Sequence, residues 1–103
     1  HIQGVAEIIE INRTTDNCAI KLRLPAALQS YIFSKGFIAV DGISLTVGEV
    51  NDGVFGLYLI PETLSVTTLG ERKVGDLLNI EMDQQSISIV QTVERVLAAR
   101  GLS

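Results

Sequence analysis

Hydrophobic and polar residues alternate along most of the chain in short segments that end at turn-forming residues. The alternation is cleanest in residues 18–24, where Cys18 and the apolar residues at every second position after it share one side. Because successive side chains of a strand point to opposite faces, this segment is predicted to be a strand with Cys18 in the core. The polar turn RTTDN joins it to the Ile- and Val-rich residues 1–12, so the two segments predict a β-hairpin.

The stretch DGISLTV places three aliphatic residues on one face of a strand and Ser44 and Thr46 on the other. An outer face usually carries long charged side chains, but this one carries two short hydroxyls followed by Gly48. This pattern indicates either the polar face of an edge strand or the floor of a binding site.

The remaining segments predict a mostly β chain with short helices. Pro25 opens a short helix over residues 25–33 that ends at Lys35 and Gly36. Further strands are predicted at residues 37–40, 43–50, 54–60 and 77–83. Six short strands with close turns are typical of a small antiparallel barrel or sandwich.

The end of the chain has a different period. From residue 86 to residue 100 the apolar positions Ile89, Val90, Val93, Val96 and Leu97 follow offsets of 0, 1, 4, 7 and 8. These offsets are typical of one face of an α-helix. The helix is predicted to dock either on its own barrel or on a second subunit.

Composition narrows the range of partners. The 103 residues suit one domain, and a net charge of -4 without a basic cluster excludes nucleic acid as the expected partner. No apolar run reaches the roughly 20 residues that a membrane-spanning helix needs. The single cysteine excludes an internal disulfide and favours a cytoplasmic protein. Since the first residue is His1, a processed chain or a fragment of a longer protein is expected.

Several common catalytic motifs are absent from the sequence. The chain has one histidine and no Gly-rich phosphate-binding motif. A Ser-His-Asp site would depend on the terminal His1, and a zinc site would lack ligands.

The chain resembles the second of the two lumazine-binding barrels of the riboflavin synthase family. The resemblance rests on HIQGVAEI at residues 1–8, KGFIAVDGISLTVGEV at 35–50, LIPETLSVTTLG at 59–70, VGDLLNIEMD at 74–83 and VERVL at 93–97. The first barrel of that family carries a Cys at the position that is Ser44 here. The resemblance therefore identifies the C-terminal half.

This resemblance implies a fold, a reaction and partners. Residues 1–85 would form a six-stranded antiparallel Greek-key barrel, and residues 86–103 a C-terminal oligomerisation helix and tail. The family moves a four-carbon unit between two molecules of 6,7-dimethyl-8-ribityllumazine, giving riboflavin and a pyrimidinedione, without metal or redox cofactor. The productive pair forms where this barrel meets the N-terminal barrel of a neighbouring subunit in a homotrimer.

The resemblance also implies site residues within the DGISLTV stretch. Ser44 and Asp41 are candidates for the chemistry, and Ser44, Leu45 and Thr46 for substrate binding. Lys35 would lie near the ribityl or carbonyl oxygens of the ligand, although a lysine here could simply be a solvated cation that caps the preceding helix. Asp41 could orient a hydroxyl or only begin the Asp-Gly turn.

Two further segments would border the ligand. The backbone at His1 and Ile2 would meet the ring, and Ile60 would cover a ring face. Polar edges of the ligand would be taken by the segment that follows Ile60, namely Pro61, Glu62, Thr63, Leu64 and Ser65. The same Pro-Glu pair also suits the start of a helix.

Subunit contacts are expected at the end of the last strand and along the tail helix. Asp83 matches a family acid near the subunit boundary, although an acid at the N-terminus of a helix would have the same position. Ile89, Val93 and Val96 are the expected helix contacts.

Two other functions share this type of barrel. The first is a non-catalytic lumazine or flavin carrier, such as the light-emission antenna proteins. A carrier has no need of hydroxyls directed at a reaction, whereas the DGISLTV and LIPETL stretches are intact here. The second is the flavin barrel of ferredoxin-reductase-like proteins, which the lack of an Arg-x-Tyr-Ser stretch disfavours.

Overall fold

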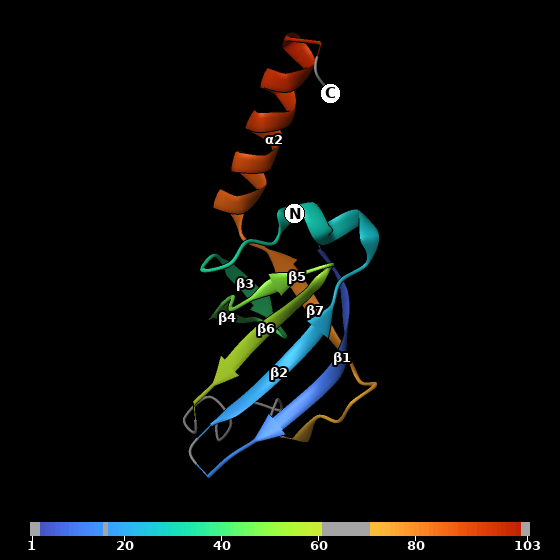
Figure 1. Cartoon of the computed structure of the whole chain (residues 1–103), viewed down its shortest axis with the longest axis vertical. Helices are drawn as coiled ribbons and strands as arrows, with labels where there is room; N and C mark the ends of the chain where they lie inside the picture. Colours follow the sequence, from blue (N-terminus) through green and yellow to red (C-terminus); the bar gives the residue numbers. More distant parts are fainter. Residues whose placement is uncertain (1–2, 16, 61–70, 102–103) are drawn as a thin grey trace.

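In the computed structural model, residues 3–15, 17–60 and 71–101 are described, and they form a curled antiparallel sheet followed by one long helix (Figure 1). The elements are β1 (Gln3–Arg13), β2 (Cys18–Arg23), the 3-10 helix η1 (Ala26–Tyr31), β3 (Phe37–Val40), β4 (Ile43–Thr46), β5 (Val50–Asn51), β6 (Val54–Leu59), β7 (Leu77–Met82) and α2 (Gln84–Ala99). The strand order is β4-β3-β7-β1-β2-β6-β5. The expected all-β fold with antiparallel strands is confirmed.

The predicted hairpin of β1 and β2 is present, and β1 also forms a corner of the sheet. Its first half pairs with β7 and its second half with β2, with Glu7 in both registers. The register with β2 shifts between Ile8 and Glu10. A bulge of this kind bends a strand and increases its twist, which lets one long strand serve both sides of a barrel.

The predicted strand over residues 43–50 is wrong as a continuous element, because it is interrupted at residues 47–49. At the start of this break, the chain is still bonded to the segment that leads into β3. The Val47 N–H donates to the Gly36 carbonyl at 2.8 Å, and the Lys35 N–H donates to the Val47 carbonyl at 2.9 Å.

From Gly48 onward, the chain is bonded to β6, near the opposite edge of the sheet. The Gly48 N–H donates to the Gly56 carbonyl at 2.8 Å, and the Gly56 N–H donates to the Glu49 carbonyl at 2.9 Å. A Cβ at Gly48 would lie 3.1 Å from the Gly56 oxygen, so the close crossing favours glycine. Among the described residues, the two ends of the curled sheet, β4 and β5, are therefore two parts of one predicted strand.

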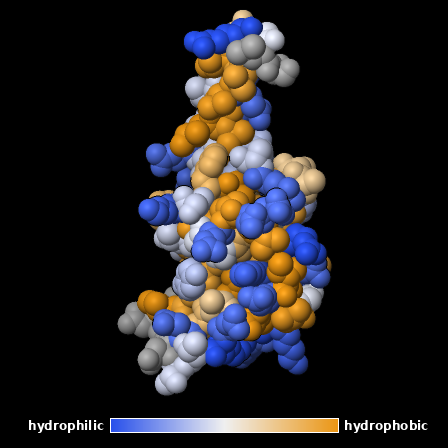
Figure 2. Space-filling view, in the orientation of Figure 1, coloured by the Kyte–Doolittle hydropathy of each residue, from blue (hydrophilic) through white to orange (hydrophobic). Residues whose placement is uncertain are grey.

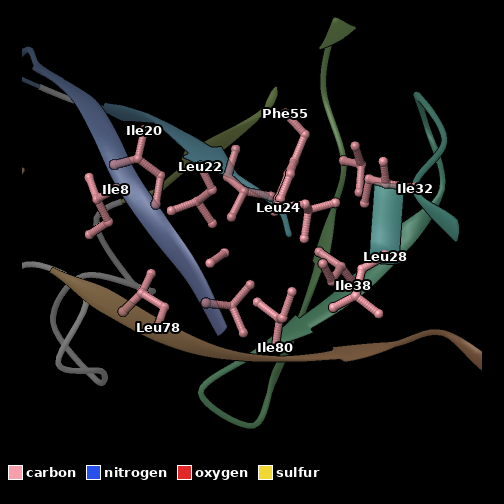
Figure 3. Close-up of a cluster of buried hydrophobic side chains, with 14 of the residues drawn as sticks. Ile8, Ile20, Leu22, Leu24, Leu28, Ile32, Ile38, Phe55, Leu78 and Ile80 are labelled. Atoms are coloured by element: carbon pink, nitrogen blue, oxygen red, sulfur yellow. The ribbon is translucent and has the colours of Figure 1, made fainter. Parts of the chain in front are cut away.

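The core lies inside this curl, where side chains from all parts of the sheet converge (Figure 3). The alternation predicted for β2 is confirmed, since Cys18, Ile20, Leu22 and Leu24 are all buried. Phe55 of β6 is 0% exposed and packs in the same cluster. The interior is thus filled by side chains, which leaves ligand binding to the outer surface and the ends of the barrel.

The two helices differ from their predicted bounds by a few residues. The short helix is a 3-10 helix that ends at Tyr31 rather than near Phe33, and Pro25 is its N-cap. The tail helix begins at Gln84, two residues before the predicted start. None of the helices in the described part of the chain is both long and apolar enough to cross a membrane.

Helix α2 extends away from the sheet, and the molecule measures 51 × 21 × 19 Å (Figure 1). Only its beginning is covered: Ile87 and Val90 are buried, and α2 contacts η1 there. Hydrophobic side chains continue along the uncovered part, as Figure 2 shows. They belong to Ile89, Val93, Val96 and Leu97, which are 37–51% exposed. Within the described chain, most of the predicted stripe therefore does not pack on its own barrel.

Candidate functional site

The site is built on the β3–β4 hairpin, whose turn has a defined type. Asp41 and Gly42 have φ angles of 47° and 84°, as a two-residue type I′ turn requires. In such a hairpin the closing pair, Val40 and Ile43, exchanges both hydrogen bonds. Hydrogen-bonded and non-hydrogen-bonded pairs alternate along an antiparallel ladder, so the next pair, Ala39 and Ser44, is a non-hydrogen-bonded pair.

This register determines what β4 presents to its surroundings. The peptide groups of Ser44 and Thr46 point away from β3, and β4 is the terminal strand of the sheet among the described residues. Both side chains are exposed, whereas Ile43 and Leu45 are half-buried and pack against the core. The edge therefore offers backbone donors and acceptors together with two hydroxyls.

Phe37 lies next to these hydroxyls on the outer face of the sheet. It is directly opposite Thr46 and is 50% exposed, although its neighbour Ile38 is buried. A half-exposed aromatic ring on a strand face provides a flat apolar surface for a planar ligand.

Two depressions meet at Phe37 and Asp83. The larger, about 310 Å³, lies between residues 33–37 and the start of α2, and Lys35 lines it. The smaller, about 180 Å³, lies beside β4 and is lined by Ser44. The structure thus brings Lys35, Ser44 and Asp83 together around one aromatic ring. The volume of the larger depression is at the lower end of the usual range for small-molecule sites, and the volume of the smaller one is below it.

The backbone at Lys35 is held in an unusual conformation. Its φ is 68°, and its N–H is bonded to the Val47 carbonyl. A non-glycine residue in the left-handed region needs such support. The lysine is therefore fixed where the chain turns from η1 into β3, with its side chain along the larger depression.

Asp83 caps α2, which is one of the two alternatives that the sequence left open, while its expected place at a subunit boundary stays a prediction. Its carboxylate is the N-cap of α2 and accepts hydrogen bonds from the N–H groups of Gln85 at 3.1 Å and Ser86 at 3.2 Å. The same residue lines both depressions. The cap thus places a carboxylate at the junction of sheet, helix and site.

Asp41, the second residue considered for the chemistry, lines neither of these depressions. Its carboxylate accepts hydrogen bonds from Arg72 Nη2 at 3.1 Å and from the Asn79 N–H at 3.0 Å. The structure therefore places Asp41 in a hydrogen-bonded network at the turn, apart from Ser44 and Lys35.

The other predicted ligand contacts are not brought together with this group. Leu45 points inward, and Ile60 is 52% exposed after the end of β6 without lining either depression. The remaining predicted contacts, His1, Ile2, Pro61, Glu62, Thr63, Leu64 and Ser65, lie outside the described residues. Of the predicted helix contacts, Ile89 lines the larger depression, while Val93 and Val96 lie farther along α2.

Two phenylalanines at the site were not predicted from the sequence. Phe33 and Phe37 line the larger depression and are 38% and 50% exposed. Alternation gave a signal for Phe37, because Ile38 and Val40 occupy the inward positions of the strand and leave Phe37 outward. No group of three or more His, Cys, Asp or Glu side chains in the described ranges could hold a metal ion.

Comparison with known proteins places the chain in one family. The family described as "Lumazine binding domain" matches residues 1–83. The chain is 52% identical over 101 residues to riboflavin synthase of Escherichia coli (strain K12), which covers 97% of this chain and 47% of that protein. Riboflavin synthase of Chlamydia pneumoniae is 45% identical over 101 residues, with 98% and 48% covered. The chain therefore spans about half the length of these relatives.

Two solved structures with a similar fold are complexes of LumP, one with a lumazine and one with riboflavin. The structure of LumP complexed with 6,7-dimethyl-8-(1'-D-ribityl) lumazine has a TM-score of 0.76 and 25% identity, covering 79% of this chain and 46% of that one. LumP complexed with riboflavin has a TM-score of 0.74 and 28% identity, with 82% and 46% covered.

Proposed function

Since the chain belongs to the family of lumazine binding domains, we propose that it is the C-terminal barrel of a riboflavin synthase and binds one molecule of 6,7-dimethyl-8-ribityllumazine. The observation that carries this proposal is the grouping of Lys35, Ser44 and Asp83 around the exposed ring of Phe37.

The chemistry of the ligand fits this group. A lumazine is a flat bicyclic ring with carbonyl and nitrogen edges and a chain of hydroxyls. Phe37 supplies an apolar surface for the ring, and the outward peptide groups and hydroxyls of Ser44 and Thr46 supply donors and acceptors for its edges. Lys35 and Asp83 supply charged partners for the ribityl hydroxyls. The site is thus mostly apolar with a few directed polar groups, as ligand sites usually are.

The proposed reaction needs two such sites. One lumazine gives a four-carbon unit to the other, which yields riboflavin and a pyrimidinedione, and no metal or redox cofactor takes part. The main contribution of the protein is to hold two reactants in a productive orientation. Orientation of this kind can lower the activation free energy of a reaction by about 7–11 kcal/mol. This chain provides one site, and the N-terminal barrel of a neighbouring subunit provides the other.

Helix α2 supports the proposed assembly. Ile89, Val93 and Val96 are about half exposed on one face of a helix that extends away from the sheet (Figure 2). A stripe of this kind buries its apolar surface when it packs against another helix. We assign it to a homotrimer of the full-length protein. We also assign the protein to the cytoplasm, because Cys18, the one cysteine of this chain, is free and buried.

A carrier function is the second candidate. Its support is that LumP occurs in complexes with lumazine, riboflavin and flavin mononucleotide. An absorbance spectrum separates the two candidates, because a tight carrier would be purified with its coloured ligand and an enzyme with fast product release would not.

The deciding experiment follows riboflavin formation from 6,7-dimethyl-8-ribityllumazine. We expect binding but little turnover with this chain alone, and a large gain when the remaining half of the Escherichia coli protein is added. Full activity of this chain by itself would contradict the half-site proposal. No gain from the added half, despite tight lumazine binding, would favour the carrier.

A further inference from the structure

We propose that Arg72 is a positioning residue, which acts through the carboxylate of Asp41 to hold β4 in place for ligand binding. The inference rests on the proposed function, because the ligand that β4 would meet is the one proposed there. Arg72 and Asp41 line neither of the depressions at Phe37, so their effect would be indirect.

The geometry ties the turn of the β3–β4 hairpin to the neighbouring strand and to Arg72. Asp41 Oδ2 accepts from Arg72 Nη2 at 3.1 Å, and Oδ1 accepts from the Asn79 N–H at 3.0 Å. The Asp41 N–H donates to the Asn79 carbonyl at 2.7 Å. The Asp41 side chain is only 16% exposed, which limits competition from water.

Arg72 is itself fixed to the other side of the sheet. Its carbonyl accepts a hydrogen bond from Arg13 Nη2 at 3.2 Å. A few residues later, the Gly75 N–H donates to the Ile8 carbonyl at 2.8 Å, and the Ile8 N–H donates to the Asp76 carbonyl at 2.9 Å. The guanidinium therefore reaches Asp41 from a segment that is hydrogen-bonded to β1. These bonds fix the position of Arg72 relative to the sheet.

The contacts of Asp41 act at the beginning of strand β4. It is four residues long and has one strand partner, β3, within the described chain. Asp41 is three positions before Ser44, so a shift of the turn moves the hydroxyls and peptide groups that face the ligand. The hydrogen bonds of Val47 and Gly48 fix the other end of β4, so the Asp41 contacts are the ones that fix the turn.

A double-mutant cycle with Asp41→Asn and Arg72→Gln tests the clamp. Asn-Gly is among the best type I′ turn sequences, so Asp41→Asn keeps the turn and an acceptor for Asn79 while it removes the charge that faces Arg72. We expect each single change to weaken 6,7-dimethyl-8-ribityllumazine binding about tenfold, since small displacements of a binding group are costly. The double variant should lose no more than either single one. Arg72→Lys, which keeps the charge, should recover part of the loss.

Arg23→Gln is the matched control, because it removes the same charge from an exposed pair with Glu7 at 4.0 Å, elsewhere on the sheet. The affinity for 6,7-dimethyl-8-ribityllumazine should not change in Arg23→Gln. Loss of affinity in Asp41→Asn but not in Arg72→Gln would mean that Asp41 contacts the ligand itself, and additive losses would mean that the two residues act separately. Either result overturns the clamp.

The ligand-free protein gives a second readout that does not depend on the proposed function. Amide chemical shifts of Ser44 and Thr46 should change in Arg72→Gln and not in Arg23→Gln. If the unaltered chain failed to bind lumazine while these shifts changed, the proposed function would be wrong and the clamp would stand. Unchanged shifts would refute the clamp even if lumazine bound tightly.

Discussion

Phe37 lies directly opposite Thr46 across β3 and β4, and both side chains are on the solvent face of the sheet. An apolar ring and a hydroxyl are thus neighbours on a surface where water would otherwise favour charged groups. This pairing leads to the first expected outcome.

Replacing Phe37 with Ala should weaken lumazine binding by about 0.5–1.5 kcal/mol, the value of an aromatic ring contact beyond its buried area. Stability should change little, since the ring is already 50% exposed. Fluorescence titration measures the first effect and thermal unfolding the second. Tyr58→Ala is the control, because Tyr58 is an exposed aromatic residue, 70% accessible, that lines neither depression. Equal losses in the two variants would remove Phe37 from the site.

Ser44→Ala and Thr46→Ala should each remove one hydrogen bond to the ligand, worth about 0.5–1.5 kcal/mol. Because both hydroxyls are exposed in the free protein, unfolding should be nearly unaffected. Fluorescence titration measures the affinity for lumazine. Thr92→Ala is the control, because it removes a hydroxyl from α2, away from β4. Unchanged affinity in both β4 variants would show that the side chains of Ser44 and Thr46 do not bind the ligand.

Substitutions at Asp83 should separate its two roles. Asp83→Ala removes the N-cap and should lower the stability of α2 by about 0.5–2 kcal/mol. Asp83→Asn keeps a capping oxygen and should preserve the helix, so a loss of lumazine affinity in this variant reports the carboxylate at the site. Circular dichroism during heating and ligand titration provide the two measurements. If Asp83→Asn binds as well as the unaltered chain, Asp83 is a cap and nothing more.

Changing Val93 and Val96 together to Asp should lower the oligomer mass in solution and leave the strands intact. The reason is that these side chains are 51% and 45% exposed on a helix that extends beyond the sheet. Sedimentation measures the mass, and Gln91→Asp with Ala98→Asp places the same two charges on the opposite face as a control. Loss of strand structure in the first variant would mean that the helix covers its own barrel.

The elements themselves were largely readable from the sequence. In β2, side chains that are two residues apart share a face. Alternating apolar and polar residues therefore predict both the strand and its buried side. The tail helix was found for the same reason with a period of 3.6. Helix bounds were missed by a few residues because a cap such as Asp83 depends on where the preceding strand ends.

Tertiary pairing explains the features that the sequence analysis missed. Gly48 is a weak local sign of a break at residues 47–49, but only the structure shows that their backbone leaves β3 and bonds to Gly56. Arg72 likewise reads as part of a polar loop, and its bond to Asp41 spans 31 positions of the chain. Contacts of that kind depend on the closure of the sheet and leave no periodic signal.

The sequence by itself determined the periods of the segments, the inward residues of β2 and β4 and the presence of hydroxyls on the outer face of β4. These properties follow from the alternation of side chains along a strand or helix, which needs no partner. The tertiary structure alone decided that Phe37, Lys35, Ser44 and Asp83 surround one surface and that Asp41 bonds to Arg72 instead of joining them. The physical reason is that strand order and register, set by burial of the common core, place residues side by side that the chain keeps far apart.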